Sequence, residues 1–228
     1  MGRVFIGHYS ASYVAKAVEP RIPLWLLFLL AQLVDIVWAG LVLAGVEKSR
    51  LVPGFTATND YQLIYVPYSH SLTAAVCWAI GAAGVWLVVR RQWRPALVIA
   101  AVVVSHWLLD LLVHTADLPL FGTEYKQGFG LWNQPYLSLG LEAGLLLLGL
   151  LFYLRARRPA SRGGLSRMWA LVIGMIAMQW VALWGNRPST MTRTAVGGLL
   201  AYLLFAALAE WFDRDAIASG PGMTRSCS

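Results

Sequence analysis

The chain is poor in cysteine and in charged residues. Its two cysteines are Cys77, inside an apolar run, and Cys227, near the end of the sequence. This pair excludes a disulfide framework and a thiolate zinc site, so a metal site would need nitrogen and oxygen ligands. Charged residues make up 13% of the chain and hydrophobic residues 58%, a balance that argues against a soluble fold. The sequence also lacks an internal repeat, a phosphate-binding loop and a dinucleotide-binding fingerprint.

Long apolar runs instead predict an all-α, polytopic membrane protein. Six segments are long enough to cross a bilayer, and a short interfacial or re-entrant helix precedes them. The six segments are Leu24–Val46, Ser69–Val89, Pro95–His114, Leu137–Tyr153, Met168–Trp184 and Ala195–Trp211. None of them resembles a cleavable signal peptide, so we expect the first span to be retained.

The basic residues lie in short connections beside these spans. If the connections alternate between the two faces of the membrane, one face carries thirteen lysines and arginines and the other carries five. Cytoplasmic loops are enriched in these residues, so we expect both termini to lie in the cytoplasm. Membrane orientation also accounts for the net charge of +7, and no nucleic-acid partner is expected.

A stretch rich in Arg, Gly and Ser at 155–167 predicts a basic cytoplasmic linker. It separates a membrane-embedded core at 1–154 from a two-helix membrane scaffold and tail at 168–228. Small residues at four-residue spacing indicate close helix packing within the core. They are Thr73, Cys77 and Gly81 in the second span, and Gly140 and Gly144 in the fourth.

Polar residues interrupt the third span. His106, Asp110 and His114 are four residues apart, so they share one face of a helix. A charged residue at the bilayer centre costs roughly 2.5 to 3.5 kcal/mol on insertion scales, which makes such a residue a functional-site candidate. A histidine and an aspartate at this spacing also form a ligand pair that one rigid helix can present to a metal.

Other spans carry further candidates. Asp35 lies near the middle of the first span, and Glu142 lies in the fourth between its two glycines. His70 stands at the head of the second span, which a tight basic connection joins to the third. These two spans should form an antiparallel hairpin, and the hairpin would bring His70 to the pair His106 and Asp110.

Four segments together resemble the LexA-binding, inner-membrane-associated family of metal-dependent hydrolases. They are GHYSASYVAK, LVDIVW, PYSHSL and SHWLLD, and the likeness covers about the first 150 residues. The resemblance implies a helical protein of the bacterial inner membrane with a divalent-metal site. The matching positions are His8, Asp35, His70, His106 and Asp110. The segment VDIVW departs from the PD-x-D pattern of such proteins, so one further carboxylate is missing.

The residues and the resemblance favour a membrane-embedded hydrolase, with residues 1–154 as its metal-dependent core. We expect zinc, with manganese as an alternative, and a phosphoester, lipid-linked or other small-molecule substrate in contact with the lipid bilayer. Asp35 or Glu142 would act as general base. Ser69, Ser105 and His114 would orient the ligands through outer hydrogen bonds.

Two other classes of function stay open on the sequence. A proton-coupled transporter would use the same buried acids and histidines as a relay. A non-enzymatic membrane scaffold would hold a structural metal. The predicted topology also places His8 on the cytoplasmic side, while His70 and Asp110 lie toward the outside. Either the N-terminal helix re-enters the membrane, or His8 is not a ligand, or the orientation is reversed.

Overall fold

The fold is described from a computed structural model that covers residues 6–157, 162–185 and 188–217. Within these ranges the chain forms eight α-helices, two 3-10 helices and two strands. The α-helices are α1 (Tyr9–Val18), α2 (Leu24–Ala31), α3 (Leu33–Leu43), α4 (Leu72–Arg90), α5 (Trp93–Val113), α6 (Pro135–Ala156), α7 (Arg162–Trp184) and α8 (Met191–Ile217). The 3-10 helices are η1 (Ile6–His8) and η2 (Leu131–Asn133), and the strands are β1 (Lys48–Leu51) and β2 (Tyr61–Tyr65).

Five helices, α4 to α8, are long and apolar enough to cross a membrane, and α2 with α3 makes a sixth span if the two are counted together. This confirms the predicted all-α, multi-span membrane protein with a short N-terminal helix. Of the predicted linker at 155–167, residues 158–161 lie outside the described part of the chain. The division into core, linker and scaffold stays a prediction.

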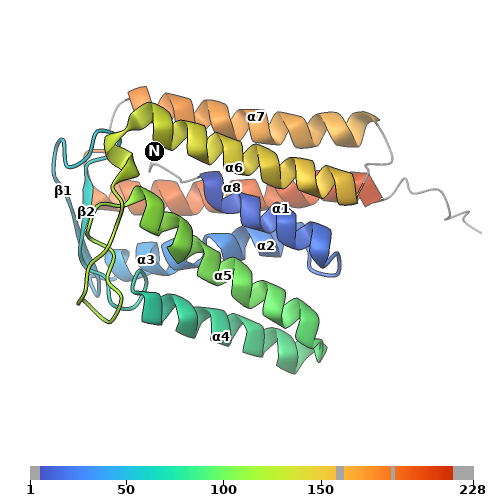
Figure 1. Cartoon of the computed structure of the whole chain (residues 1–228), viewed down its shortest axis with the longest axis horizontal. Coiled ribbons are helices and arrows are strands. Elements are labelled where there is room, and N and C mark those ends of the chain that lie inside the picture. Colours follow the sequence, from blue (N-terminus) through green and yellow to red (C-terminus); the bar gives the residue numbers. More distant parts are fainter. Residues whose placement is uncertain (1–5, 158–161, 186–187, 218–228) are drawn as a thin grey trace, which may run out of the picture.

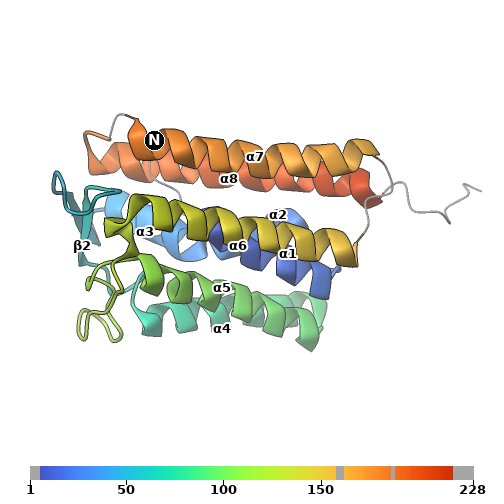
Figure 2. The ribbon, with the colours of Figure 1, turned by 45° about the horizontal axis from the view of Figure 1, so that its top comes forward.

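The helices run side by side, with the strands and the long loops gathered at one end (Figure 1). Helices α7 and α8 form one side of the bundle, and the hairpin of α4 and α5 forms the opposite side (Figure 2). Between them lie α1, α2, α3 and α6. The connections from α1 to α2 and from α4 to α5 meet at the end opposite the strands, and this is the end that carries Arg21 and the arginines of the α4–α5 connection.

The first predicted span is broken rather than continuous. Helices α2 and α3 meet at Gln32 with a bend of 57°. Gln32 has φ −110° and ψ 12°, outside the helical range. The last carbonyl groups of a helix lack partners within it. The break therefore frees the carbonyl of Ala31, the last residue of α2, to bind another element.

Helix α1 lies inside the bundle, where it packs against α6 and α2. Tyr9 and Tyr13 are fully buried among apolar side chains. At the other end of α1, the ammonium group of Lys16 donates to the Pro20 and Ile22 carbonyls and lies 3.1 Å from Asp213 Oδ2. His8, which precedes α1, is therefore buried within the bundle, and whether the N-terminal segment re-enters the membrane stays a prediction.

The prediction that Gly140 and Gly144 pack closely against another helix is wrong. A Cβ added at either glycine would meet nothing within 4 Å, and the same holds for Gly81 in α4. The close approach is instead at Gly149, where a Cβ would lie 2.8 Å from both the Cα and the carbonyl oxygen of Ser10 in α1. The four-residue spacing identified small residues but not the face of the helix that meets a neighbour.

We expect Gly149→Ala to destabilise the protein by about 1 to 3 kcal/mol, because backbone atoms of α1 would have to shift. The matched substitution Gly144→Ala lies in open space and should be neutral or slightly stabilising, since alanine favours helix. Thermal unfolding of the two variants in detergent measures the difference. Equal shifts in Tm would contradict close packing of α1 on α6.

The polar connection from 47 to 68 contains the two strands. Strands β1 and β2 pair antiparallel within it, with Leu51 opposite Tyr61. Leu63 of β2 is buried and packs in a cluster with Trp38 and Trp107. The hairpin therefore covers the end of the bundle at which α3 and α5 finish.

Candidate metal centre

Four histidines surround the carboxylate of Asp110. Its Oδ1 lies 3.1 Å from His8 Nε2 and 4.0 Å from His114 Nε2. Its Oδ2 lies 3.1 Å from His106 Nε2 and 3.9 Å from His70 Nε2. The sequence contains four histidines, so all of them point Nε2 at this one carboxylate.

Asp35 brings a second carboxylate to the same place. Its Oδ1 lies 3.3 Å from His70 Nε2 and 3.8 Å from His106 Nε2. Two sets of possible ligand atoms result, each with its members within 4.8 Å of one another: one from His8, His106 and Asp110, and one from Asp35, His70 and His106. His106 belongs to both sets. The five residues matched through the family resemblance are therefore brought together.

Different elements supply these side chains. His8 ends η1, Asp35 lies in the first turn of α3 just after the break, and His70 precedes Ser71, the N-cap of α4. His106 and Asp110 lie one turn apart on α5, as their spacing predicted. The hairpin of α4 and α5 places His70 next to them, as expected, and the imidazole of His8 stacks on that of His106 at 3.9 Å.

The outer ring nitrogens of three histidines are held by acceptors. His106 Nδ1 lies 2.7 Å from the Ala31 carbonyl, which can only accept, so Nδ1 carries the proton. His114 Nδ1 lies 2.9 Å from Asp117 Oδ1. The hydroxyl group of Ser69 donates to another partner and therefore accepts from His70 Nδ1 at 2.9 Å. When His70, His106 and His114 are neutral, Nε2 of each is therefore unprotonated, and its lone pair faces the carboxylates.

Positive charge at the centre, from a bound cation or from protons on the imidazole groups, would stabilise this arrangement. Lone pairs and carboxylate oxygens repel one another at about 3 Å, and burial strengthens the repulsion. His106 Nε2 is buried and has no hydrogen-bond partner within the described part of the chain. A divalent cation would balance the two carboxylates and accept the Nε2 lone pairs. Histidines held at the outer nitrogen by a carboxylate or a carbonyl are typical of metal ligands, so the residues fit a divalent metal.

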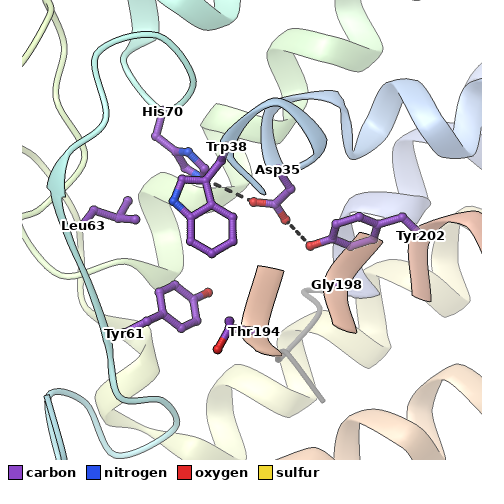
Figure 3. A pocket seen from close by; sticks show the side chains of 8 residues that line it. All are labelled: Asp35, Trp38, Tyr61, Leu63, His70, Thr194, Gly198 and Tyr202. Atoms are coloured by element: carbon purple, nitrogen blue, oxygen red, sulfur yellow. Dashed lines mark hydrogen bonds and ion pairs between the residues drawn. The ribbon is translucent and has the colours of Figure 1, made fainter. Parts of the chain in front are cut away.

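Of the two candidate carboxylate ligands, Asp35 is the more exposed. Its side chain is 19% exposed, whereas the side chain of Asp110 is 5% exposed. It faces a pocket that Figure 3 shows between α3, β2 and α8. Asp35 reaches His70 through one oxygen, and its Oδ2 accepts a hydrogen bond of 2.7 Å from the Tyr202 hydroxyl. The other lining residues are Trp38, Tyr61, Leu63, Thr194 and Gly198.

His114 lies at the rim of the cluster, just beyond the end of α5. Its Nδ1 atom is paired with the adjacent Asp117 carboxylate. Asp117 is itself fixed, because its Oδ2 accepts from the Leu63 backbone N–H at 3.2 Å. Both residues thus join β2 to the end of α5.

Two residues that sequence reasoning missed hold the site from outside. Glu47 is buried and accepts hydrogen bonds from the Tyr68 and Ser69 backbone N–H groups and from the Ser69 hydroxyl. Tyr202 of α8 binds Asp35. No local pattern marks either residue, because a glutamate after a span and a tyrosine in an apolar helix are both ordinary.

Ser105 and Glu142 lie differently from the other candidates. The Ser105 hydroxyl donates to the Val102 carbonyl of its own helix. Glu142 belongs to neither set of possible ligand atoms. It lines another cavity, with Ser138 and Gln179. Of the two carboxylates expected to act as general base, only Asp35 is placed at the histidine cluster.

Comparison with known protein families, with curated proteins and with solved structures finds no match for this chain.

Proposed function

We propose that the protein is a membrane-embedded, metal-dependent hydrolase. The observation that carries the proposal is the set of Nε2 atoms directed at the carboxylates of Asp35 and Asp110, with the Nδ1 atoms of three histidines held by acceptors. His8, His70, His106, Asp35 and Asp110 would hold the metal. Nitrogen and oxygen ligands of this kind suit zinc, with manganese as the alternative.

A divalent metal at this position would supply Lewis-acid activation of water and of a substrate oxygen. Asp35 is the proposed general base, because it is the carboxylate that reaches the open pocket. The Tyr202 hydroxyl holds Asp35 Oδ2, so Oδ1 stays directed at the histidines. Trp38 and Tyr61 would shield the reacting group from bulk water at the pocket wall.

The position of the pocket favours a substrate from the outer face or the outer leaflet. The pocket includes residues of β2 and lies toward the end of the bundle with the strands, opposite the arginine-bearing end. The arginine-bearing end is the proposed cytoplasmic face of a bacterial inner membrane. The pocket has aromatic walls and borders the residues that would hold the metal, and a bound cation there would suit a phosphoester on a lipid or on another small molecule.

The resemblance to the LexA-binding, inner-membrane-associated hydrolases agrees with this proposal. Each of the four segments that carry the likeness contributes at least one residue to the cluster, although they are spread over about 100 residues of sequence.

The test compares metal content and hydrolysis in detergent-purified protein. We expect wild type to bind zinc or manganese in stoichiometric amounts and to cleave a fluorescent phospholipid or bis(p-nitrophenyl) phosphate. His106→Ala should lose both properties. Ser105→Ala, on the same helix, should keep both because its hydroxyl bonds within α5. A wild-type protein that retains no metal after zinc or manganese addition would refute the proposal.

One observation favours the alternative of a proton-coupled transporter. The break between α2 and α3 lies beside the cluster, and broken helices are common at the substrate sites of carriers. A transporter would move protons or substrate across proteoliposomes without bond cleavage. This alternative would be established if proton or substrate flux was lost in Asp35 and Asp110 variants while the wild-type protein cleaved no phosphoester.

A further inference from the structure

A second polar cavity lies between α6, α7 and the loop that precedes β2. Its lining includes Glu142 of α6, Gln179 of α7 and Asn59 of the loop. These three side chains are 1%, 4% and 3% exposed, respectively. None of them contributes to the sets of possible ligand atoms at the histidine cluster. The cavity is therefore a separate site.

Three oxygen atoms in this cavity are unsatisfied. Glu142 Oε2, Gln179 Oε1 and Asn59 Oδ1 are buried and have no hydrogen-bond partner within the described part of the chain. A buried polar atom without a partner costs about 1 to 3 kcal/mol, and a charged one costs more. An occupant that supplies positive charge or hydrogen-bond donors would satisfy all three atoms at once.

The hydroxyl groups of the cavity add to the same chemistry. Ser138 Oγ donates to Glu142 Oε1 at 3.3 Å and keeps its lone pairs. Thr58 also lines the cavity. Carboxylate, amide and hydroxyl oxygens are ligands that hard cations prefer over nitrogen or sulfur donors.

Charge balance decides the valence of the occupant. Glu142 is the one carboxylate among the described lining residues, and none of those residues is basic. An isolated carboxylate within a membrane protein is expensive unless a positive charge accompanies it. A single carboxylate balances one positive charge, whereas a divalent ion would leave excess charge in a medium of low dielectric constant.

We propose that this cavity binds one sodium ion through Glu142, Gln179 and Asn59. The ion would join three segments that are far apart in sequence: the loop before β2, α6 and α7. Helix α6, which carries Glu142, packs against η1, which ends in His8. Sodium binding would therefore stabilise the entry of the N-terminal segment into the bundle without adding a ligand to the metal centre.

The experiment measures equilibrium binding of ²²Na⁺ to detergent-purified full-length protein, in choline chloride at constant ionic strength. We expect one saturable site per chain. Glu142→Gln and Gln179→Leu should each weaken binding at least tenfold. Glu210→Gln is the matched control, because Glu210 is also a carboxylate in a long helix but lines a different groove. It should bind as wild type does.

Two further measurements keep the test independent of the hydrolase proposal and of folding defects. Wild type treated with a chelator, and His106→Ala, should keep the sodium site even though both lack the divalent metal. If Glu142→Gln does not fold, Gln179→Leu carries the test with the carboxylate intact. Absence of saturable ²²Na⁺ binding would overturn the proposal, since a proton on Glu142 or a single water would then satisfy the cavity. Unchanged binding in Gln179→Leu would overturn it equally.

Discussion

Asp110→Asn should abolish metal binding and hydrolysis together. The Asp110 carboxylate lies within 4.0 Å of the Nε2 atoms of all four histidines, so the substitution removes a charge that the whole cluster shares. An asparagine keeps the volume but loses the charge that balances a divalent cation. We expect the purified variant to carry less than about a tenth of the wild-type metal, because removal of even an outer partner costs 10–100-fold in metal affinity.

Chelation gives the same prediction a stability readout. Metal at 1,000 times its Kd stabilises a native protein by about 4.1 kcal/mol, so EDTA should lower the wild-type Tm by roughly 8–16 °C. Asp110→Asn should not respond to EDTA. Asp60→Asn is the control, since Asp60 lies in a loop and bonds the Gly54 N–H. A chelator response in Asp110→Asn equal to that of wild type would place the metal elsewhere.

The sequence predicted the part of the site that local periodicity and short connections govern. His106 and Asp110 share a helix face because 3.6 residues make a turn, and this spacing does not depend on the rest of the fold. His70 follows from one tight connection, since two antiparallel helices must bring the start of one beside the end of the other. These inferences need only the second and third spans and the short connection between them.

The placement of His8 needed information that a count of spans does not contain. Assigning the connections alternately to the two faces of the membrane assumes that each segment either crosses the membrane completely or stays outside it. The segment from η1 to the end of α1 fits neither case, because it is short and packs within the bundle against α6. Gly149 permits that approach through its contact with Ser10. A glycine among many glycines in an apolar helix gives no sequence signal for this role.

The helix break at Gln32 explains why the sequence did not predict the hydrogen bonds that hold the histidines from outside the cluster. A run such as LLFLLAQLVDIVW is apolar enough for one continuous span, and no glycine or proline marks an interruption. The bend frees the Ala31 carbonyl, and this carbonyl fixes the tautomer of His106. The tautomer of a ligand histidine thus depends on a backbone group from a distant helix, which only tertiary structure can place there.

Glu47→Gln should lower metal affinity by about 10–100-fold through His70. The wild-type Glu47 carboxylate accepts from the Ser69 hydroxyl at 2.6 Å, which leaves Ser69 Oγ to accept from His70 Nδ1. A glutamine amide at this position would donate to Ser69 instead. The serine hydroxyl would then donate to His70 Nδ1, so the proton would move to Nε2 and block its lone pair. Competition with a chelating dye measures the affinity.

A double-mutant cycle separates this positioning role from a general loss of structure. On a His70→Ala background, Glu47→Gln should have little further effect on metal affinity, because the residue through which Glu47 acts is absent. Glu124→Gln, in an exposed loop at the same end of the bundle, should leave the affinity unchanged. Additive losses in the double variant would show that Glu47 supports the fold of the β1–β2 region rather than the tautomer of His70.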